Sequence, residues 1–377
     1  MSENTVRFGV IGCGLMGREF ASASMRWIHL LGDIPRPVIV AACDVSDKNL
    51  DYFRGVPDVK LFTHDYHELL ADPDVEAVYC AVPHRLHQQV YTDVINAGKH
   101  LIGEKPFGID MPAFLAIKKA ADAHPELLVR CTSEFPYFPA VQQMVSWYRE
   151  GRFGKIIEAH FSIRHSSDMD VTKPINWKRI RSENGEYGCM GDLGIHTEHL
   201  PFRLGFRPRT VSAVLSKLVE TRPDASGKPV PCETWDNATL LCEAENDSGD
   251  IFPLRFEMKR MAPGCSNTVE YEIYGMNLSA RFSTDDPNAL MYTESHGTSQ
   301  AWARLPIGQK TLFPVITGGI FEFGFSDSLL QMFAAFTSEL RGKECPFTCF
   351  TPEEAHLSHI LQTSALESYT QKKTVTL

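Results

Sequence analysis

The stretch that decides the fold of the first part of this chain is Val6-Arg7-Phe8-Gly9-Val10-Ile11-Gly12-Cys13-Gly14-Leu15-Met16-Gly17. An apolar, β-branched run leads into three glycines spaced G-x-G-x-x-G, and residues 18–31 then have the pattern of a helix. A strand, a tight turn and a helix in this order suit the pyrophosphate of a dinucleotide. Gly12 permits the turn, Gly14 lets the backbone approach the phosphates, and Gly17 allows close packing of helix and strand. The helix start attracts the anion, so Gly12, Gly14, Leu15 and Met16 are predicted cofactor contacts.

The composition is that of a globular protein with more than one core. The chain has 377 residues, of which 43% are apolar and 22% charged. This length predicts two domains. The net charge of −10 has no long run of like charges, which argues against nucleic acid and against an anionic membrane surface as partners.

Cysteine usage and the N-terminus predict a cellular compartment. The ten cysteines are scattered and form no C-x-x-C pair, which favours reduced, buried thiols and predicts no metal site. Cys345 and Cys349 have no obvious partners to complete a tetrahedral set. No apolar stretch is long enough for a membrane span, and residues 1–4 are polar, so we expect a cytoplasmic protein.

An acidic residue ends the next apolar run. Residues 38–43 read as a second buried parallel strand, and Asp44 follows directly. An acid at this position accepts hydrogen bonds from the adenosine ribose and repels a 2′-phosphate, which favours NAD over NADP. The alternative is that Asp44 only caps the next helix.

Further strands deliver polar residues to the same edge of the sheet. The run 77–82 is a buried strand halted by Pro83, and carboxyl ends of such strands face the cofactor crevice. Val82, Pro83, His84 and His87 are therefore candidates for lining it, although either histidine alone is equally compatible with a helix cap or a surface position. A helix is predicted over 86–97, closing at Gly98.

The strand that follows ends in Glu104-Lys105-Pro106. It brings an acid, a lysine and a proline to the edge where the nicotinamide should lie. The proline keeps Lys105 out of the helical region and makes a cis bond possible. The alternative is a solvated Glu-Lys pair in a turn. With a last strand at 127–131, alternating strands and helices predict a doubly wound parallel sheet, a Rossmann domain, over residues 1–131.

The second half has a different pattern. A helix at 139–150 leads into a strand at 154–164, and further strands with hairpin-type connections are predicted at 210–220, 238–245, 252–260, 269–275 and 278–283. This predicts an α+β domain over residues 132–377, built on a large, mostly antiparallel open sheet with helices on one face, so that the whole chain is α/β in class.

One helix in this half carries two groups suited to proton chemistry. It begins at Gly188-Cys189-Met190-Gly191, and Asp192 and His196 follow four residues apart. At that spacing two side chains share one helix face and can act on one substrate atom. An Asp–His pair at this spacing is also common as a purely structural contact.

The motifs in combination resemble the Gfo/Idh/MocA oxidoreductases (glucose–fructose oxidoreductase and inositol dehydrogenase-like sugar dehydrogenases). The resemblance spans nearly the whole chain. It is carried by the glycine motif, by G-K-H at 98–100, by E-K-P at 104–106, and by D-x-G-x-H at 192–196. It implies an NAD-dependent dehydrogenase acting on a small carbohydrate or polyol, and a homodimer or homotetramer.

The resemblance also implies roles for individual residues. Lys105, Asp192 and His196 form the catalytic site: His196 exchanges the proton of a secondary alcohol as it becomes a ketone, Lys105 bonds the same oxygen, and Asp192 orients the substrate. A base of near-neutral pKa and a cation beside the oxygen suit this chemistry. Cofactor contacts are expected from Glu104, Lys105 and Trp177. Arg164, His165 and Lys178 are candidate substrate ligands beside the catalytic residues.

Two positions depart from the family pattern. His199 stands where many members have an acid, and His84 stands where many have asparagine. Two alternatives to a dehydrogenase stay open: a redox-neutral, glycosidase-like enzyme that uses tightly held NAD, and a non-catalytic NAD-binding regulator.

Overall fold

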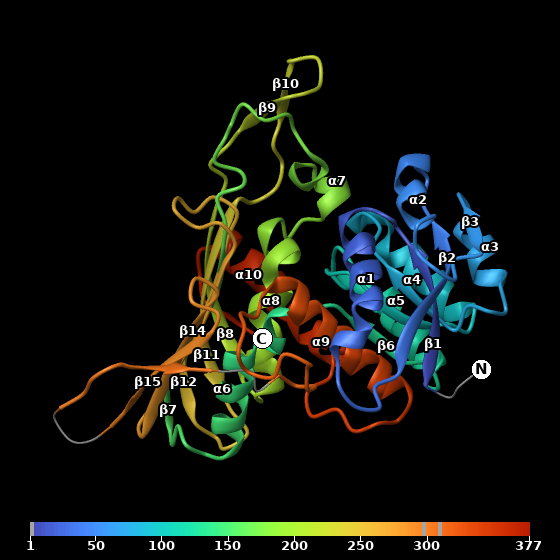
Figure 1. Cartoon of the computed structure of the whole chain (residues 1–377). Coiled ribbons are helices and arrows are strands. Elements are labelled where there is room, and N and C mark those ends of the chain that lie inside the picture. The colour runs from blue at the N-terminus through green and yellow to red at the C-terminus, as the bar shows by residue number, and fades with distance from the viewer. Residues whose placement is uncertain (1–3, 296–298, 308–310) are drawn as a thin grey trace. The chain divides into compact units, whose positions relative to one another are not determined.

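The computed structural model describes residues 4–295, 299–307 and 311–377, and contacts divide the chain into two compact units (Figure 1). Unit 1 comprises Met1–Gly108, Pro112–Tyr137 and Thr311–Pro352, and unit 2 comprises Ile109–Met111, Phe138–Lys310 and Glu353–Leu377. The sequence predicts two consecutive domains, 1–131 and 132–377. The structure differs from this division because a segment near the C-terminus returns to unit 1.

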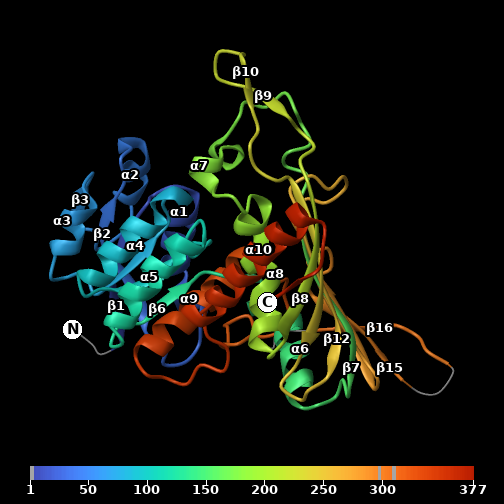
Figure 2. The same cartoon turned by 180° about the vertical axis from the view of Figure 1, so that it is seen from behind.

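Unit 1 is built on a six-stranded sheet with the order β3-β2-β1-β4-β5-β6, in which every neighbouring pair is parallel. Its strands are β1 (Thr5–Ile11), β2 (Arg36–Cys43), β3 (Leu61–Thr63), β4 (Ala77–Cys80), β5 (His100–Gly103) and β6 (Val129–Cys131). Its helices are α1 (Leu15–Met25), α2 (Asp47–Phe53), α3 (Tyr66–Ala71), α4 (His87–Asn96), α5 (Met111–Ala123) and α9 (Phe325–Leu340). The predicted doubly wound parallel sheet is confirmed, and Figure 2 shows its helices from behind.

Helices cover both faces of this sheet because side chains alternate along each strand. In β1, the Phe8 ring packs edge-on against Phe20 of α1, with centroids 4.9 Å apart, and lies 6.0 Å from Phe336 of α9. The next residue, Gly9, faces α3, where an added Cβ would lie 2.5 Å from Leu69. Two consecutive residues of one strand thus contact helices on opposite faces.

The returning segment completes the apolar core of unit 1. Phe333 of α9 packs against Phe20 at 4.7 Å and against Tyr79 of β4 at 5.5 Å between ring centroids. Without α9, these buried aromatic rings of α1 and β4 would face water. This requirement explains why residues far along the chain belong to the first unit.

Unit 2 is built on a nine-stranded sheet with the order β16-β15-β14-β13-β7-β12-β11-β8-β17. Its strands are β7 (Ile156–Arg164), β8 (Arg207–Ser216), β11 (Asn237–Glu245), β12 (Ile251–Lys259), β13 (Thr268–Gly275), β14 (Leu278–Ser283), β15 (Ala289–Glu294), β16 (Ala303–Pro306) and β17 (Val375–Thr376). Among these strands β7 and β12 pair in parallel and the other neighbours are antiparallel. The predicted large, mostly antiparallel sheet is therefore confirmed, and β9 (Thr221–Pro223) and β10 (Pro229–Pro231) form a separate hairpin that the sequence does not predict.

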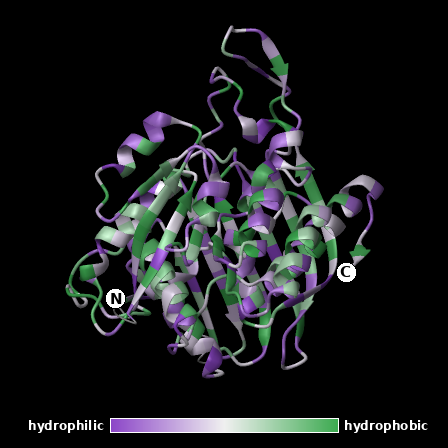
Figure 3. Cartoon of the chain, turned by 90° about the vertical axis from the view of Figure 1, so that its right-hand side faces the viewer, coloured by the Kyte–Doolittle hydropathy of each residue, from purple (hydrophilic) through white to green (hydrophobic). Residues whose placement is uncertain are grey.

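Helices α6 (Pro139–Arg149), α7 (Arg181–Asn184), α8 (Cys189–Arg203) and α10 (Pro352–Gln371) also belong to this part of the chain. Buried and exposed residues alternate along β11 and β12. The buried face packs on α8, where Phe202 lies 6.4 Å from Phe256 between ring centroids. Figure 3 shows hydrophobic residues gathered along the strands. Across the described ranges of the chain, we find no helix with the length and apolarity that a membrane span requires.

Candidate active site

The glycine turn after β1 has the geometry that its sequence predicts. Gly12 has a φ of +93°, and a Cβ there would lie 2.4 Å from the Ala81 carbonyl oxygen. A Cβ on Gly17 would lie 2.3 Å from the Gly12 carbonyl oxygen, so α1 packs directly on the turn. Gly14 is the N-cap of α1, and a Cβ there would meet nothing within 4 Å. The first and last glycines are required by packing, whereas the middle one borders open space.

Asp44 joins the glycine turn to the start of α2. Its carboxylate accepts hydrogen bonds from the Cys13 N–H at 2.7 Å, the Ser46 N–H at 2.8 Å and the Asn49 side-chain amide at 3.2 Å. The carboxylate is half-buried. The N-cap of α2 is Ser46, so Asp44 binds the residue before the helix and the side chain of Asn49 rather than a backbone N–H of the first helical turn. These contacts hold Asp44 at the carboxyl end of β2, where the ribose contact is predicted.

A cavity of about 660 Å³ opens at the carboxyl ends of the parallel strands of unit 1. Five predicted cofactor residues line it, namely Gly12, Gly14, Asp44, Val82 and Pro83. Further lining residues that the sequence reasoning did not name include Asn49, His64, Tyr66, Leu86 and Gln89. His64 could have been predicted, because it directly follows β3 and therefore lies at the same edge of the sheet. The volume of the cavity is that of a small-molecule site.

The two histidines after β4, His84 and His87, are not among the residues that line this cavity, and their predicted contact with the cofactor stays a prediction. His87 is fully buried, and its ring nitrogens lie 2.7 Å from the Pro106 carbonyl oxygen and 2.9 Å from the Val82 carbonyl oxygen. Burial lowers the pKa of His87 to about 4. His84 is also buried, with 5% exposure. Both rings are therefore buried, and His87 joins the segments that follow β4 and β5.

The Glu104-Lys105-Pro106 segment lies at the carboxyl end of β5. The Glu104 side chain is buried, and its carboxylate accepts a hydrogen bond from the Tyr79 hydroxyl at 2.8 Å. Lys105 is half-buried, and its peptide bond to Pro106 is cis. The acid is thus anchored inside the sheet core, while the lysine is the member of the pair with solvent exposure.

At the start of α1, Leu15 is 76% exposed and Met16 is half-buried.

In unit 2, α8 carries Asp192 and His196 one turn apart, and both are buried. Each Asp192 carboxylate oxygen lies 3.0 Å from the Lys178 ammonium, and Oδ2 lies 3.3 Å from a guanidinium nitrogen of Arg260. The Tyr271 hydroxyl donates a hydrogen bond to the His196 carbonyl oxygen, which anchors α8 to β13. The predicted Asp–His spacing therefore lies in a buried helix whose acid is held by two cations.

The predicted substrate ligands separate into two groups. Arg164 is paired with Glu270 of the neighbouring strand β13, and alternation places it on the sheet face opposite to Ile163, which is buried in the core. Arg164 is therefore held in an ion pair on that face, and its role as a substrate ligand stays a prediction. His165, one residue later, is close enough to Asp192 and Lys178 to feel both charges, and burial is the main cause that lowers its pKa.

Trp177 belongs to the 3-10 turn Trp177–Arg179 and is half-exposed rather than buried. The Lys178 ammonium lies 5.7 Å from the centroid of its ring. The structure therefore groups Trp177 with Lys178, and its predicted contact with the cofactor stays a prediction.

Arg260 is the residue of this site that sequence reasoning missed. It is fully buried, although it follows Phe252, Leu254, Phe256 and Met258 at the core-facing positions of β12. An arginine that continues a buried i, i+2 series needs a buried partner for its charge. That periodicity was the available signal, and Asp192 is one of the partners.

Glu198 and His199 follow His196 by two and three residues in α8, and both are fully buried. The Glu198 carboxylate accepts hydrogen bonds from the Ser358 hydroxyl and from the Gln362 amide at 3.2 Å, both on α10. Burial raises the pKa of Glu198 from 4.5 to about 7. The folded chain therefore binds this proton more tightly than the unfolded chain does.

This raised pKa predicts how stability depends on pH. The contribution of protonated Glu198 is complete below about pH 4.5 and is lost as the pH rises through about 7. As the pH rises from 5 to 8, we expect the free energy of unfolding to fall less in Glu198→Gln than in the wild type. The expected difference between the two falls is about 1–3 kcal/mol. Denaturant titrations at both pH values measure this difference. Glu353→Gln, at an exposed position in the first turn of α10, serves as control, and equal pH dependence of Glu198→Gln and the wild type would contradict the prediction.

Comparisons with known proteins agree with this architecture. A family model described as an oxidoreductase family with an NAD-binding Rossmann fold matches residues 6–130, and one described as the GFO/IDH/MocA C-terminal domain matches residues 141–281. Levoglucosan dehydrogenase of Pseudarthrobacter phenanthrenivorans is 26% identical over 298 residues, which are 73% of each chain. Inositol 2-dehydrogenase of Rhizobium meliloti is 27% identical over 219 residues, covering 57% of this chain and 60% of that protein. A solved structure of levoglucosan dehydrogenase in complex with NADH has the same fold, with a TM-score of 0.86 at 20% identity over 99% of both chains.

Proposed function

This chain belongs to the GFO/IDH/MocA family of NAD(P)-dependent oxidoreductases, and we propose that it oxidises a secondary hydroxyl of a sugar, anhydrosugar or cyclitol to a ketone, or catalyses the reverse reaction. Relatives named for levoglucosan and for inositol support this substrate class. The observation that carries the proposal is the pair Asp192 and His196, buried one turn apart on α8 with Lys178 on the acid.

The residues of unit 1 fit NAD as the cofactor. The open space at Gly14 and the backbone N–H groups at the start of α1 suit a pyrophosphate. The Asp44 carboxylate at the cavity wall suits ribose hydroxyls and disfavours a 2′-phosphate. NAD, when bound, supplies a hydride acceptor for the carbon that is oxidised.

Two side chains then act on the reacting hydroxyl, and two more orient the substrate. His196 removes the hydroxyl proton in the oxidation and returns it in the reverse direction, a role that suits the ordinary pKa of histidine. Lys105 donates a hydrogen bond to the same oxygen and stabilises the negative charge that develops on it. Asp192 and Lys178 together offer an acceptor and a donor to neighbouring hydroxyl groups, which orients the carbon that is oxidised. Cofactor binding by unit 1, substrate binding by unit 2, and a homodimer or homotetramer are part of the proposal.

The test is nicotinamide absorbance during incubation with NAD⁺ or NADP⁺ and a panel of pyranoses, anhydrosugars and inositols. We expect NADH to form with one substrate class and NAD⁺ to be preferred over NADP⁺. Consumption of a glycoside without net NADH would instead indicate the redox-neutral enzyme. Retained NADH binding without consumption of any substrate would indicate a regulator. Either of these two results would contradict the proposed dehydrogenase.

A further inference from the structure

We infer that Arg260 is a positioning residue of the substrate site, because its single buried guanidinium holds both the Asp192 carboxylate and the backbone of Lys178. The inference rests on the proposed function, in which Asp192 and Lys178 orient the substrate. It adds a residue that lies outside the sequence motifs and outside the predicted ligands.

The geometry around Arg260 joins segments that are far apart in the sequence. Its Nη2 lies 3.3 Å from Asp192 Oδ2, and its Nη1 donates to the Lys178 carbonyl oxygen at 3.2 Å. Its remaining acceptors are the Thr234 hydroxyl at 3.4 Å, the Asn184 side-chain carbonyl at 3.4 Å and the Gly188 carbonyl at 3.3 Å. One side chain therefore contacts the start of α8, the turn that carries Lys178, and the segment before β11.

A guanidinium is required at this position for a physical reason. Its planar fork carries five N–H donors in fixed directions, whereas an ammonium is a compact point charge with three. Arg260 is 0% exposed, so its charge is tolerated only with paired and hydrogen-bonded neighbours. Asp192, also fully buried, supplies the opposite charge. Removing the arginine would leave a buried carboxylate held by Lys178 without this second cation.

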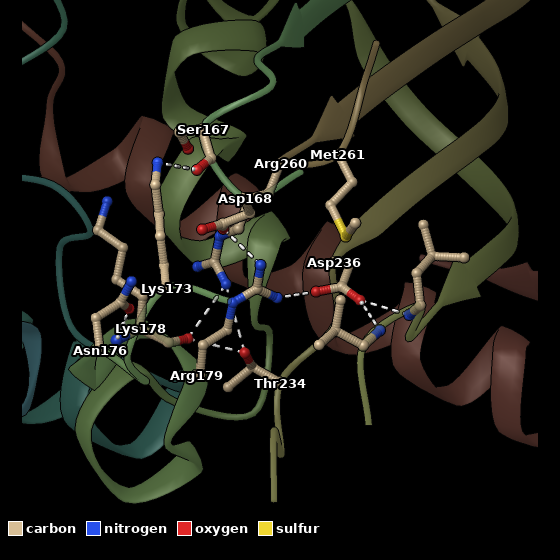
Figure 4. A network of polar contacts seen from close by, with 12 residues as sticks. Ser167, Asp168, Lys173, Asn176, Lys178, Arg179, Thr234, Asp236, Arg260 and Met261 are labelled. Carbon is tan, nitrogen blue, oxygen red and sulfur yellow. Dashed lines mark hydrogen bonds and ion pairs between the residues drawn. The ribbon is translucent and has the colours of Figure 1, made fainter. Parts of the chain in front are cut away.

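The turn that carries Lys178 is held from a second direction by Arg179 (Figure 4). The buried Arg179 guanidinium pairs with Asp168 at 2.5 Å and with Asp236. The Lys178 carbonyl also accepts a hydrogen bond from the Thr234 hydroxyl at 2.8 Å. The backbone of the turn is thus fixed, while the Lys178 side chain remains 37% exposed. Arg260 is the member of this network that contacts Asp192 as well as the turn.

This arrangement assigns Arg260 an effect on the substrate and none on the cofactor. Arg260 holds the Asp192 carboxylate in one orientation, while the Lys178 ammonium that pairs with Asp192 contacts the substrate. A misplaced orienting group lowers turnover steeply because the reacting atoms must be held in near-attack geometry. We therefore expect Arg260→Met to lower kcat/KM for the substrate by about 100-fold, with KM for NAD⁺ unchanged. Arg260→Lys keeps the charge and should recover part of the loss.

The matched control is Arg203→Gln, which breaks an arginine–carboxylate pair at the other end of the same helix. Arg203 Nε lies 2.6 Å from Glu354, and both side chains are mostly buried. The two arginine variants should lose comparable stability, but Arg203→Gln should keep the kcat/KM of the wild type. Thermal unfolding and NADH fluorescence establish that each variant is folded and binds cofactor.

The outcomes separate this inference from the function beneath it. Wild-type kcat/KM in folded Arg260→Met, or equal loss in Arg203→Gln, would overturn the inference alone. Absence of turnover by the wild type across the substrate panel would overturn both. If Arg260→Met does not fold, Arg260→Lys decides: an intermediate kcat/KM with unchanged KM for NAD⁺ supports the positioning role, and full activity refutes it.

Discussion

Replacing His196 with asparagine is expected to lower kcat by about 10²–10⁴-fold, the usual contribution of a general acid–base group. Asparagine keeps hydrogen-bonding capacity but cannot exchange a proton near neutral pH. His196 is buried in α8, and the hydrogen bond from Tyr271 to its carbonyl is a backbone interaction that the substitution leaves in place. Steady-state kinetics with the substrate found in the panel measure the loss. NADH binding by the variant, followed by fluorescence, should equal that of the wild type.

A second buried histidine of unit 2 provides the control. His359 of α10 is 4% exposed, and its ring lies 5.6 Å from the ring of Tyr187. His359→Asn should lower thermal stability without a comparable loss of kcat. If both variants lose kcat equally, or if His196→Asn retains wild-type kcat, His196 is not the acid–base group.

Lys105→Met is expected to lower kcat by about 10²–10³-fold, because a cation positioned at the reacting oxygen stabilises charge that develops in the transition state. Lys105→Arg should keep part of the activity, since it retains the charge in a different geometry. KM for NAD⁺ separates two proposed roles of this residue. A change in kcat with unchanged cofactor affinity indicates a role at the substrate oxygen, whereas a large rise in KM for NAD⁺ indicates that Lys105 mainly binds cofactor.

Lys99→Met is the matched control for Lys105. The Lys99 ammonium donates to the carbonyl oxygens of Asp72 and Val75 at 3.0 and 2.7 Å, at the amino end of the parallel strands. The two lysines flank β5 (His100–Gly103) at opposite ends. Lys99→Met should therefore lower stability and leave kcat unchanged. Unchanged kcat in Lys105→Met would remove Lys105 from the proposed mechanism.

Much of the fold follows from short-range sequence patterns. The predicted strand before Gly12 is β1, and the glycine turn follows it. The helix predicted over residues 18–31 begins and ends earlier in the structure, as α1 (Leu15–Met25), and a separate 3-10 turn follows at Trp27–His29. Predicted strands at 238–245, 252–260, 269–275 and 278–283 match β11 to β14 closely. The strands β15, β16 and β17 and the hairpin β9–β10 were not predicted, because strands of two to six residues carry little periodicity.

The site was predictable only in part. The four-residue spacing of Asp192 and His196 predicted that both lie on one face of one helix, and both are in α8. The ring of His87 lies against two backbone carbonyls, and nothing in the local sequence indicates their position. The sequence also does not show that Arg164, the last residue of β7, pairs with Glu270 of the neighbouring strand β13.

The sequence by itself determined the family, the NAD-binding turn at Gly12 to Gly17, the parallel and antiparallel characters of the two sheets, and the shared helix of Asp192 and His196. These features depend on residues within a few turns or one strand of each other, where spacing alone constrains geometry. Only the tertiary structure decided that Thr311–Pro352 completes unit 1 and that Arg260 holds Asp192. The physical reason is that a buried aromatic ring needs apolar neighbours and a buried charge needs an opposite charge, and the fold supplies both from distant parts of the sequence. The partners of the ion pair, Asp192 and Arg260, lie 68 residues apart (260 − 192).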